Sequence, residues 1–125
     1  MAPDTHLLYT PPRFWAAFLM VRAALHLLLH VAVPGAVARI FYRQVFVRAL
    51  VIMLATMLID LDHLLADPVY DPGRCSIGFH PLHQYPIMVV YALLAVWPKT
   101  RLIGLGLVIH MLLDGVDCFW MQYEM

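Results

Sequence analysis

Histidine and aspartate residues recur at helical spacing inside the most apolar parts of this chain. Pairs of them are three or four residues apart, so that each pair would share one face of a helix. Imidazole and carboxylate groups together form a ligand set that suits Zn²⁺, Fe or Mn. The sequence therefore predicts a metal site. The expected ligands are His26, His30, Asp60, His63, His80, His83, His110 and Asp114.

The cost of placing ionisable groups among apolar ones favours shared cations. A single histidine in such a setting is more often a hydrogen-bonded packing residue, but unpaired carboxylates in hydrocarbon cost several kcal/mol each. We expect one or two ions, with two slightly favoured. Asp60 and Asp62 are two apart, so an unbroken helix would not direct both to one ion. Asp62 and Asp117 are expected to orient a histidine or to act as a general base.

Two arginines are candidates for substrate binding. Arg22 lies one turn before His26 and could bind an anionic group such as phosphate. Pairing with an aspartate, or extension of its charged end toward the membrane surface, explains Arg22 equally well. Arg74 could also recognise a phosphorylated head group.

The composition indicates which solvent surrounds these residues. Of 125 residues, 63% are hydrophobic and 13% are charged, and the mean hydropathy is +0.79. A soluble domain of this size would carry more charge, so the chain is expected to be an integral membrane protein in the lipid bilayer. The formal net charge of zero gives no basic field for nucleic acid. The length fits one domain, residues 1–125.

Four apolar segments predict an all-α bundle of about four transmembrane helices, because hydrocarbon offers no partner for free backbone groups. The third segment is short for a span unless it begins near Pro81. A cleaved signal peptide is an alternative for the first segment, but about 20 residues with internal charges are too long and too polar. The segments are Phe14–Val33, Val45–Ala66, Tyr85–Trp97 and Leu102–Trp120.

The depth of the ligands tests whether they can meet. At 1.5 Å per residue, the expected ligands of the last three segments lie roughly 14–28 Å from one membrane face, the face that holds the first and third connections between segments. His26 and His30 reach this depth only if the first helix continues, kinked at Pro34, to about Tyr42. We therefore expect a long first helix.

Basic residues predict the orientation. They occur at the first and third connections, which lie on one side of a four-helix topology and are expected to be cytoplasmic. Both termini and the loop 67–79 would then face the periplasm from a bacterial inner membrane. Cys75 and Cys118 fall on that side, where a disulfide and free thiols are both possible. The basic residues are Arg39, Arg43, Arg48, Lys99 and Arg101.

The runs HLLLH, IDLDHLLADPVYDPGRCSIGFHPLH and HMLLDGVDC resemble a small bacterial family of membrane proteins. Their pattern is similar to that of YdjM-like inner-membrane metal-dependent hydrolases, over most of the chain from His26 to Cys118. The resemblance implies a site at an Asp-x-Asp-His motif, here Asp60 to His63, and at a later segment with His80 and His83. One departure is Gln84, where the YdjM-like pattern usually has serine.

These observations together favour a metal-dependent hydrolase, with Zn²⁺ as the expected ion, acting on a lipid or another amphiphilic ester or phosphoester. A membrane di-iron oxidoreductase acting on acyl chains is the second hypothesis, because histidine-rich helical sites also serve there. The third is a non-enzymatic metal-binding or transport protein, or a structural subunit. Ligands concentrated at one depth weigh against transport.

Overall fold

The structure is a computed structural model that describes residues 12–124. Four α-helices and three short 3₁₀ segments account for most of these residues, and no strand occurs among them. The predicted all-α class is therefore confirmed. The α-helices are α1 (Arg13–Phe41), α2 (Phe46–Ala55), α3 (Tyr85–Val96) and α4 (Arg101–Glu124). The 3₁₀ segments are η1 (Arg43–Val45), η2 (Thr56–Leu65) and η3 (Pro81–His83).

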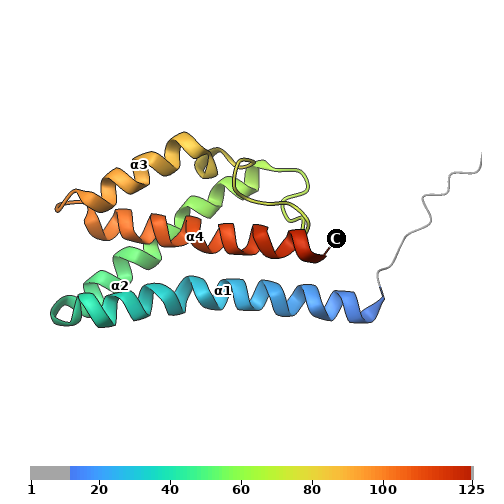
Figure 1. The fold of residues 1–125 in the computed structure, drawn as a ribbon, viewed down its shortest axis with the longest axis horizontal. Helices are drawn as coiled ribbons and strands as arrows, with labels where there is room; N and C mark the ends of the chain where they lie inside the picture. Colours follow the sequence, from blue (N-terminus) through green and yellow to red (C-terminus); the bar gives the residue numbers. More distant parts are fainter. Residues whose placement is uncertain (1–11, 125) are drawn as a thin grey trace, which may run out of the picture.

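The helices form an up-and-down bundle (Figure 1). The short connections after α1 and after α3 lie at one end of the molecule. The long loop between η2 and η3 lies at the opposite end, together with the start of α1 and the end of α4. The basic residues of the two short connections therefore share one end, as the sequence predicts.

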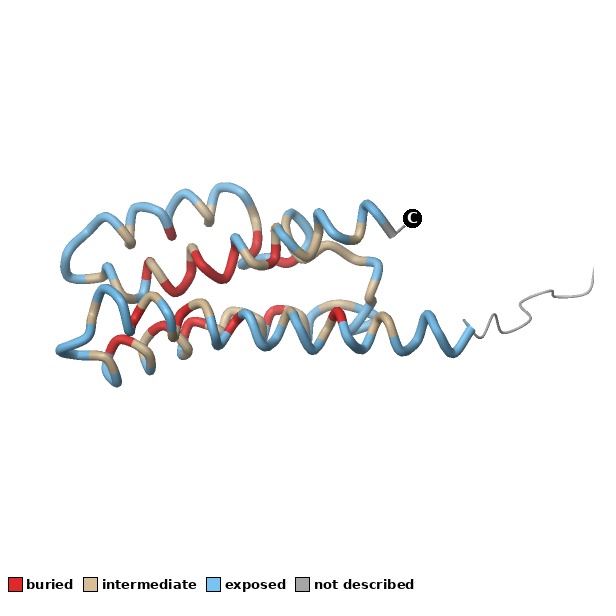
Figure 2. Tube along the Cα trace, turned by 60° about the horizontal axis from the view of Figure 1, so that its bottom comes forward, coloured by how far each residue is buried: buried red, intermediate tan, exposed pale blue. Residues whose placement is uncertain are grey.

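Three stretches are long and apolar enough to cross a membrane: Arg13–Phe41, Arg43–Leu65 and Arg101–Tyr123. Helix α3 is apolar but has only 12 residues. Its length of about 18 Å is too short for a hydrocarbon layer of about 30 Å. The bundle thus combines three candidate spans with one shorter helix. Exposed residues follow the outer faces and buried residues the inner faces (Figure 2), as expected for helices that contact lipid.

Helix α1 runs through Pro34 without interruption and ends at Phe41. The expected continuation past Pro34 is therefore confirmed. Proline removes one backbone hydrogen-bond donor, which a packed membrane helix tolerates because its neighbours satisfy the freed carbonyl. Pro34 is buried within the bundle. The long helix places His26 and His30 beside α4.

The second apolar segment differs from the single helix that we expected. It changes from α-helix to 3₁₀-helix at Thr56, whose hydroxyl donates a 2.6 Å hydrogen bond to the carbonyl of Met53. Such a bond competes with the backbone ladder. In a 3₁₀-helix residues three apart are eclipsed, so η2 places Asp60 and His63 on one face. The carboxylate of Asp62 also reaches His63, with Oδ1 3.1 Å from Nδ1. A 3₁₀ run of ten residues is unusually long, since most such runs have three or four residues.

Helices α3 and α4 pack closely around a core of Tyr91, Leu107 and Met111. They approach each other closely at Gly104. A Cβ atom there would lie 2.0 Å from the backbone nitrogen of Ala95 and 2.3 Å from the carbonyl carbon of Leu94. Backbone atoms cannot move aside as a flexible side chain can, so this position requires glycine.

We predict that Gly104→Ala lowers the free energy of unfolding by about 3 kcal/mol or more, because overpacking forces the two helices apart. Gly35→Ala is the matched control. A Cβ at Gly35 meets no atom within 4 Å, and alanine favours a helix over glycine by about 1 kcal/mol. Thermal unfolding in mild detergent measures both variants. Equal melting temperatures would contradict the close approach.

Candidate metal centre

Four side chains from η2, η3 and α4 converge on one point in the bundle. Asp60 Oδ1 lies 3.1 Å from His110 Nε2 and 3.3 Å from His83 Nε2. Asp114 Oδ2 lies 3.2 Å from His83 Nε2 and 3.5 Å from His110 Nε2. Except for Asp60, which borders a pocket, these side chains are almost fully buried. We call this set the four-ligand cluster.

The spacing of the four-ligand cluster fits a tetrahedral ion. Zn²⁺ binds imidazole nitrogen and carboxylate oxygen at about 2.0–2.1 Å, and tetrahedral geometry then separates neighbouring ligand atoms by about 3.3–3.4 Å. The four measured separations run from 3.1 to 3.5 Å. Two imidazoles and two carboxylates at these separations form a group that could hold a metal ion.

A second group of ligand atoms lies beside the first. His26 Nε2 and His30 Nε2 are 3.3 and 3.4 Å from Asp114 Oδ1. The two rings lie one helical turn apart on α1, with centroids 4.3 Å apart, as the spacing of their residues predicts. Two histidines and one carboxylate leave coordination positions open, unlike a closed four-ligand site. We call this set the three-ligand cluster.

Asp114 belongs to both clusters. Its Oδ2 atom faces His83 and His110, and its Oδ1 atom faces His26 and His30. A carboxylate shared in this way is how helical bundles join two metal ions. Asp114 is thus the carboxylate common to two of the groups that could hold an ion.

Several buried atoms of these clusters make no hydrogen bond within the described part of the chain. They are His30 Nε2, His83 Nε2, His110 Nδ1 and Asp114 Oδ2. A buried polar group without a partner costs about 1–3 kcal/mol. Three of the four atoms point into the ligand clusters, where an ion would satisfy them. His110 Nδ1 is the exception, since the opposite nitrogen of that ring faces the cluster.

Neighbouring groups fix which nitrogen of each ring is available. His30 Nδ1 lies 2.9 Å from the carbonyl oxygen of His26. A carbonyl only accepts, so Nδ1 carries the proton and Nε2 has a free lone pair. His83 Nδ1 likewise donates to Asp62 Oδ2 at 3.1 Å, which leaves its Nε2 atom for the four-ligand cluster. Such outer hydrogen bonds orient metal-binding histidines.

Asp62 is almost fully buried, and both its carboxylate oxygens have partners. Oδ2 accepts hydrogen bonds from His83 Nδ1 and from the backbone N–H of Leu82 at 2.8 Å. Oδ1 lies 3.1 Å from His63 Nδ1. Asp62 therefore connects η2 to η3 and positions two histidines.

The carboxylates determine how His83 binds protons. Burial by itself would lower the pKa of the His83 imidazole. Close contacts with the carboxylates of Asp114, Asp60 and Asp62 outweigh burial and raise this pKa to about 10. A metal ligand must be deprotonated, so protons and metal ions compete for the four-ligand cluster.

His63 and His80 stack on each other beside the clusters, with ring centroids 3.7 Å apart. Burial, and next the charge of His63, lower the pKa of His80 and favour its neutral form. His63 shares a possible ligand group with Asp62 and His83. Among the described residues, His80 belongs to none of the three groups that could hold an ion. The proposed role of His80 as a ligand stays a prediction.

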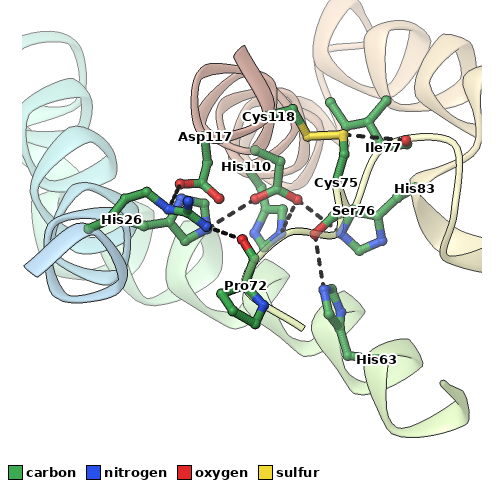
Figure 3. The surroundings of a disulfide bond; sticks show 12 residues. His26, His63, Pro72, Cys75, Ser76, Ile77, His83, His110, Asp117 and Cys118 are labelled. Atoms are coloured by element: carbon green, nitrogen blue, oxygen red, sulfur yellow. Dashed lines mark hydrogen bonds and ion pairs between the residues drawn. A yellow bond between two sulfur atoms is a disulfide. The ribbon is translucent and has the colours of Figure 1, made fainter. Parts of the chain in front are cut away.

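A pocket of about 300 Å³ opens onto the clusters. His26, Asp60 and Asp114 form one wall, and the long loop forms another with Tyr70, Pro72 and Ser76. Figure 3 shows Pro72 and Ser76 beside His26, His63 and His110. The pocket connects the bridging carboxylate to the end of the bundle that carries the loop.

The two arginines expected to bind substrate make contacts within the protein. Arg22 is buried, its Nε atom lies 3.2 Å from Asp117 Oδ1, and its Nη2 atom donates to the carbonyl of Pro72. These contacts match the alternative in which Arg22 pairs with an aspartate. Arg74 donates to the carbonyls of Pro68 and Val69, and its guanidinium lies 4.6 Å from the centre of the Phe79 ring. Both arginines also line the pocket, and whether they bind substrate stays a prediction.

A disulfide joins Cys75 of the loop to Cys118 of α4, so the first of the two alternatives for these cysteines is the one observed (Figure 3). The bond holds the loop against α4 one residue from Asp117, whose partner Arg22 also binds the loop. Two independent ties therefore keep this wall of the pocket in place.

The structure brings seven of the eight expected ligands into possible ligand groups and leaves His80 outside them. Sequence reasoning missed Ser76, whose Oγ atom lies 3.1 Å from His63 Nε2. One signal was available. Ser76 is the only serine in the sequence, and it lies in the loop that leads to the His80 and His83 segment.

Comparisons with known proteins leave the chemistry open. No curated protein and no solved structure matches the chain. The link to YdjM-like hydrolases is therefore not shown. A family model does match residues 20–121, which is most of the chain and includes every ligand described above. The chain therefore belongs to DUF6122, a family of unknown function.

Proposed function

We propose that this protein is a membrane-embedded hydrolase with two metal ions bridged by Asp114. The observation that carries the proposal is the position of this carboxylate. Each of its oxygens lies 3.2–3.5 Å from the ring nitrogens of two histidines, and the two pairs of histidines are different. Buried histidines that only packed or shared hydrogen bonds would not need two such sets of converging nitrogens.

The two clusters suit different tasks. The four-ligand cluster supplies a full tetrahedral set and fits an ion that is held firmly. The three-ligand cluster leaves positions open and borders the pocket, so it fits the ion that meets substrate. A bound ion of this kind polarises a scissile ester or phosphoryl oxygen and lowers the pKa of coordinated water toward about 7.

The other residues of the chain orient these groups and limit access. Asp62 holds His83 and His63, and the backbone of α1 holds the His30 ring. The Arg22–Asp117 pair closes one side of the pocket. Asp117 lines the pocket and is the proposed proton acceptor there, while both oxygens of Asp62 already have histidine partners.

The surroundings of the pocket favour an amphiphilic substrate. The pocket lies at the loop end of helices that are apolar and exposed on their outer faces. A lipid or another amphiphilic ester or phosphoester could place its polar group in the pocket while its chain stays among these side chains. Arg22 and Arg74 line the pocket. They are the cations that would bind the polar group if it is anionic.

A membrane di-iron oxidoreductase is the second candidate. The observation that favours it is the His26, His30 and Asp114 set, because two histidines and one carboxylate with open positions are typical of non-haem iron. The identity of the bound metal distinguishes the two candidates.

The proposal is tested on protein purified in mild detergent. We expect two equivalents of zinc by elemental analysis, and hydrolysis of long-chain esters or phosphoesters that stops on chelation and returns with zinc. Two equivalents of iron would favour the oxidoreductase. Protein without bound metal after purification and zinc addition, or fully loaded protein that hydrolyses none of these esters, would contradict the proposal.

A further inference from the structure

One hydrogen-bonded chain of side chains lies beside the four-ligand cluster and the three-ligand cluster and belongs to neither of them. Ser76 Oγ lies 3.1 Å from His63 Nε2, and His63 Nδ1 lies 3.1 Å from Asp62 Oδ1. The carboxylate of Asp60 is farther from the same ring nitrogen, at 3.6 Å. Serine, histidine and aspartate in this order, through opposite nitrogens of one ring, have the arrangement of a nucleophilic triad.

The burial of the three side chains also fits a triad. Asp62 is almost fully buried, with 4% of its side chain exposed, and 29% of the His63 side chain is exposed. Ser76 and His63 line the pocket that also contains Asp60 and Asp114. A buried carboxylate, a histidine between, and a hydroxyl at the pocket follow the order in which a triad activates its serine.

The loop holds Ser76 in position. Its neighbour Cys75 is bonded to α4, and the backbone carbonyl of Ser76 accepts hydrogen bonds from the N–H groups of Phe79 and His80, both at 3.2 Å. Figure 3 shows the serine hydroxyl directed at the His63 ring. A mobile surface serine would have no such support. Catalysis requires that the reacting group be held in the correct geometry.

We propose that Ser76 is a catalytic nucleophile for amphiphilic carboxylic esters, with His63 as its proton acceptor and Asp62 as the group that positions His63. The inference rests on the proposed hydrolase function and names its substrate class.

The Ser76 hydroxyl proton moves to His63 Nε2 while Oγ bonds to the carbonyl carbon. The bond to the alcohol breaks, and the alcohol takes the proton from His63. Water then cleaves the acyl-serine by the same transfers, which releases the acid and restores Ser76.

A fluorophosphonate probe tests the nucleophile without knowledge of the natural substrate. Its phosphorus forms a bond to an activated serine oxygen while fluoride leaves. We expect one adduct on wild-type protein at Ser76, the only serine present, and none on Ser76→Ala. Labelling of His63→Ala should be at least about 100-fold slower, the low end of what a general base contributes. Thr100→Ala removes a hydroxyl at the opposite end of the bundle and should label like wild type.

Hydrolysis of a long-chain carboxylic ester gives the second readout. It should fall at least about 100-fold in Ser76→Ala while the metal content stays the same. Unlabelled wild-type protein, or ester hydrolysis by Ser76→Ala at the wild-type rate, would overturn the inference. Hydrolysis by Ser76→Ala would leave the metal-dependent hydrolase standing. An adduct at Ser76 in protein that binds no metal would support the serine nucleophile and contradict the metal-dependent hydrolase. If Ser76→Ala does not fold, the labelling of wild type decides.

Discussion

Asp114→Asn is expected to remove both metal ions from the purified protein. The amide keeps the size of the side chain but loses the negative charge and one of the two oxygens that face the clusters. Four histidine nitrogens that now converge on this carboxylate would lose their shared partner. We expect the bound metal to fall from two equivalents to less than about one tenth, since removal of one partner from a buried charged set is strongly destabilising. Elemental analysis after gel filtration measures the loss.

Asp67→Asn is the matched control, because Asp67 is exposed in the loop and belongs to none of the possible ligand groups. It should retain both ions. Retention of two ions by Asp114→Asn, in protein that still carries its disulfide, would show that this carboxylate is not the bridge.

His83→Ala and His80→Ala should differ sharply, although the two residues are three apart in one segment. His83 Nε2 lies between both carboxylates of the four-ligand cluster, so its loss removes one of four ligands and leaves Asp60 without a ring partner from η3. We expect one ion to be lost and hydrolysis to fall by at least about 100-fold, toward the upper range for changes near a metal ligand. His80 stacks on His63, and its loss should leave both ions bound.

Metal content and zinc titration of the two variants measure this contrast. Equal metal loss in both would place His80 among the ligands, as the sequence alone predicts. Full retention in both would remove His83 from the four-ligand cluster.

The helical bundle and the meeting of ligands follow from simple features of the sequence. The length and apolar character of the segments set the helices, and the three- and four-residue spacings pair His26 with His30 and His110 with Asp114. Ligands at a common depth require α1 to pass Pro34, and it does so. The helices and the pairs within them are predictable because the sequence of one helix determines each of them by itself.

The remaining features depend on contacts between segments. Spacing alone could not show that His80 stacks on His63 while His83 faces Asp60 and Asp114, since both lie around η3. The pairing of Arg22 with Asp117 depends on how α1 packs against α4. The change to a 3₁₀-helix at Thr56 and the approach of Ser76 to His63 depend on η2 and on the path of the loop. Local patterns do not encode such partners.

The bond between Cys75 and Cys118 sets an order of events during biosynthesis. Cys118 lies on α4, so the covalent tie can form only after this part of α4 has left the ribosome. Asp114 is four residues earlier in α4, so the carboxylate shared by the two clusters leaves the ribosome before the tie can form. Formation of the disulfide therefore completes the loop wall of the pocket only once Asp114 is in place.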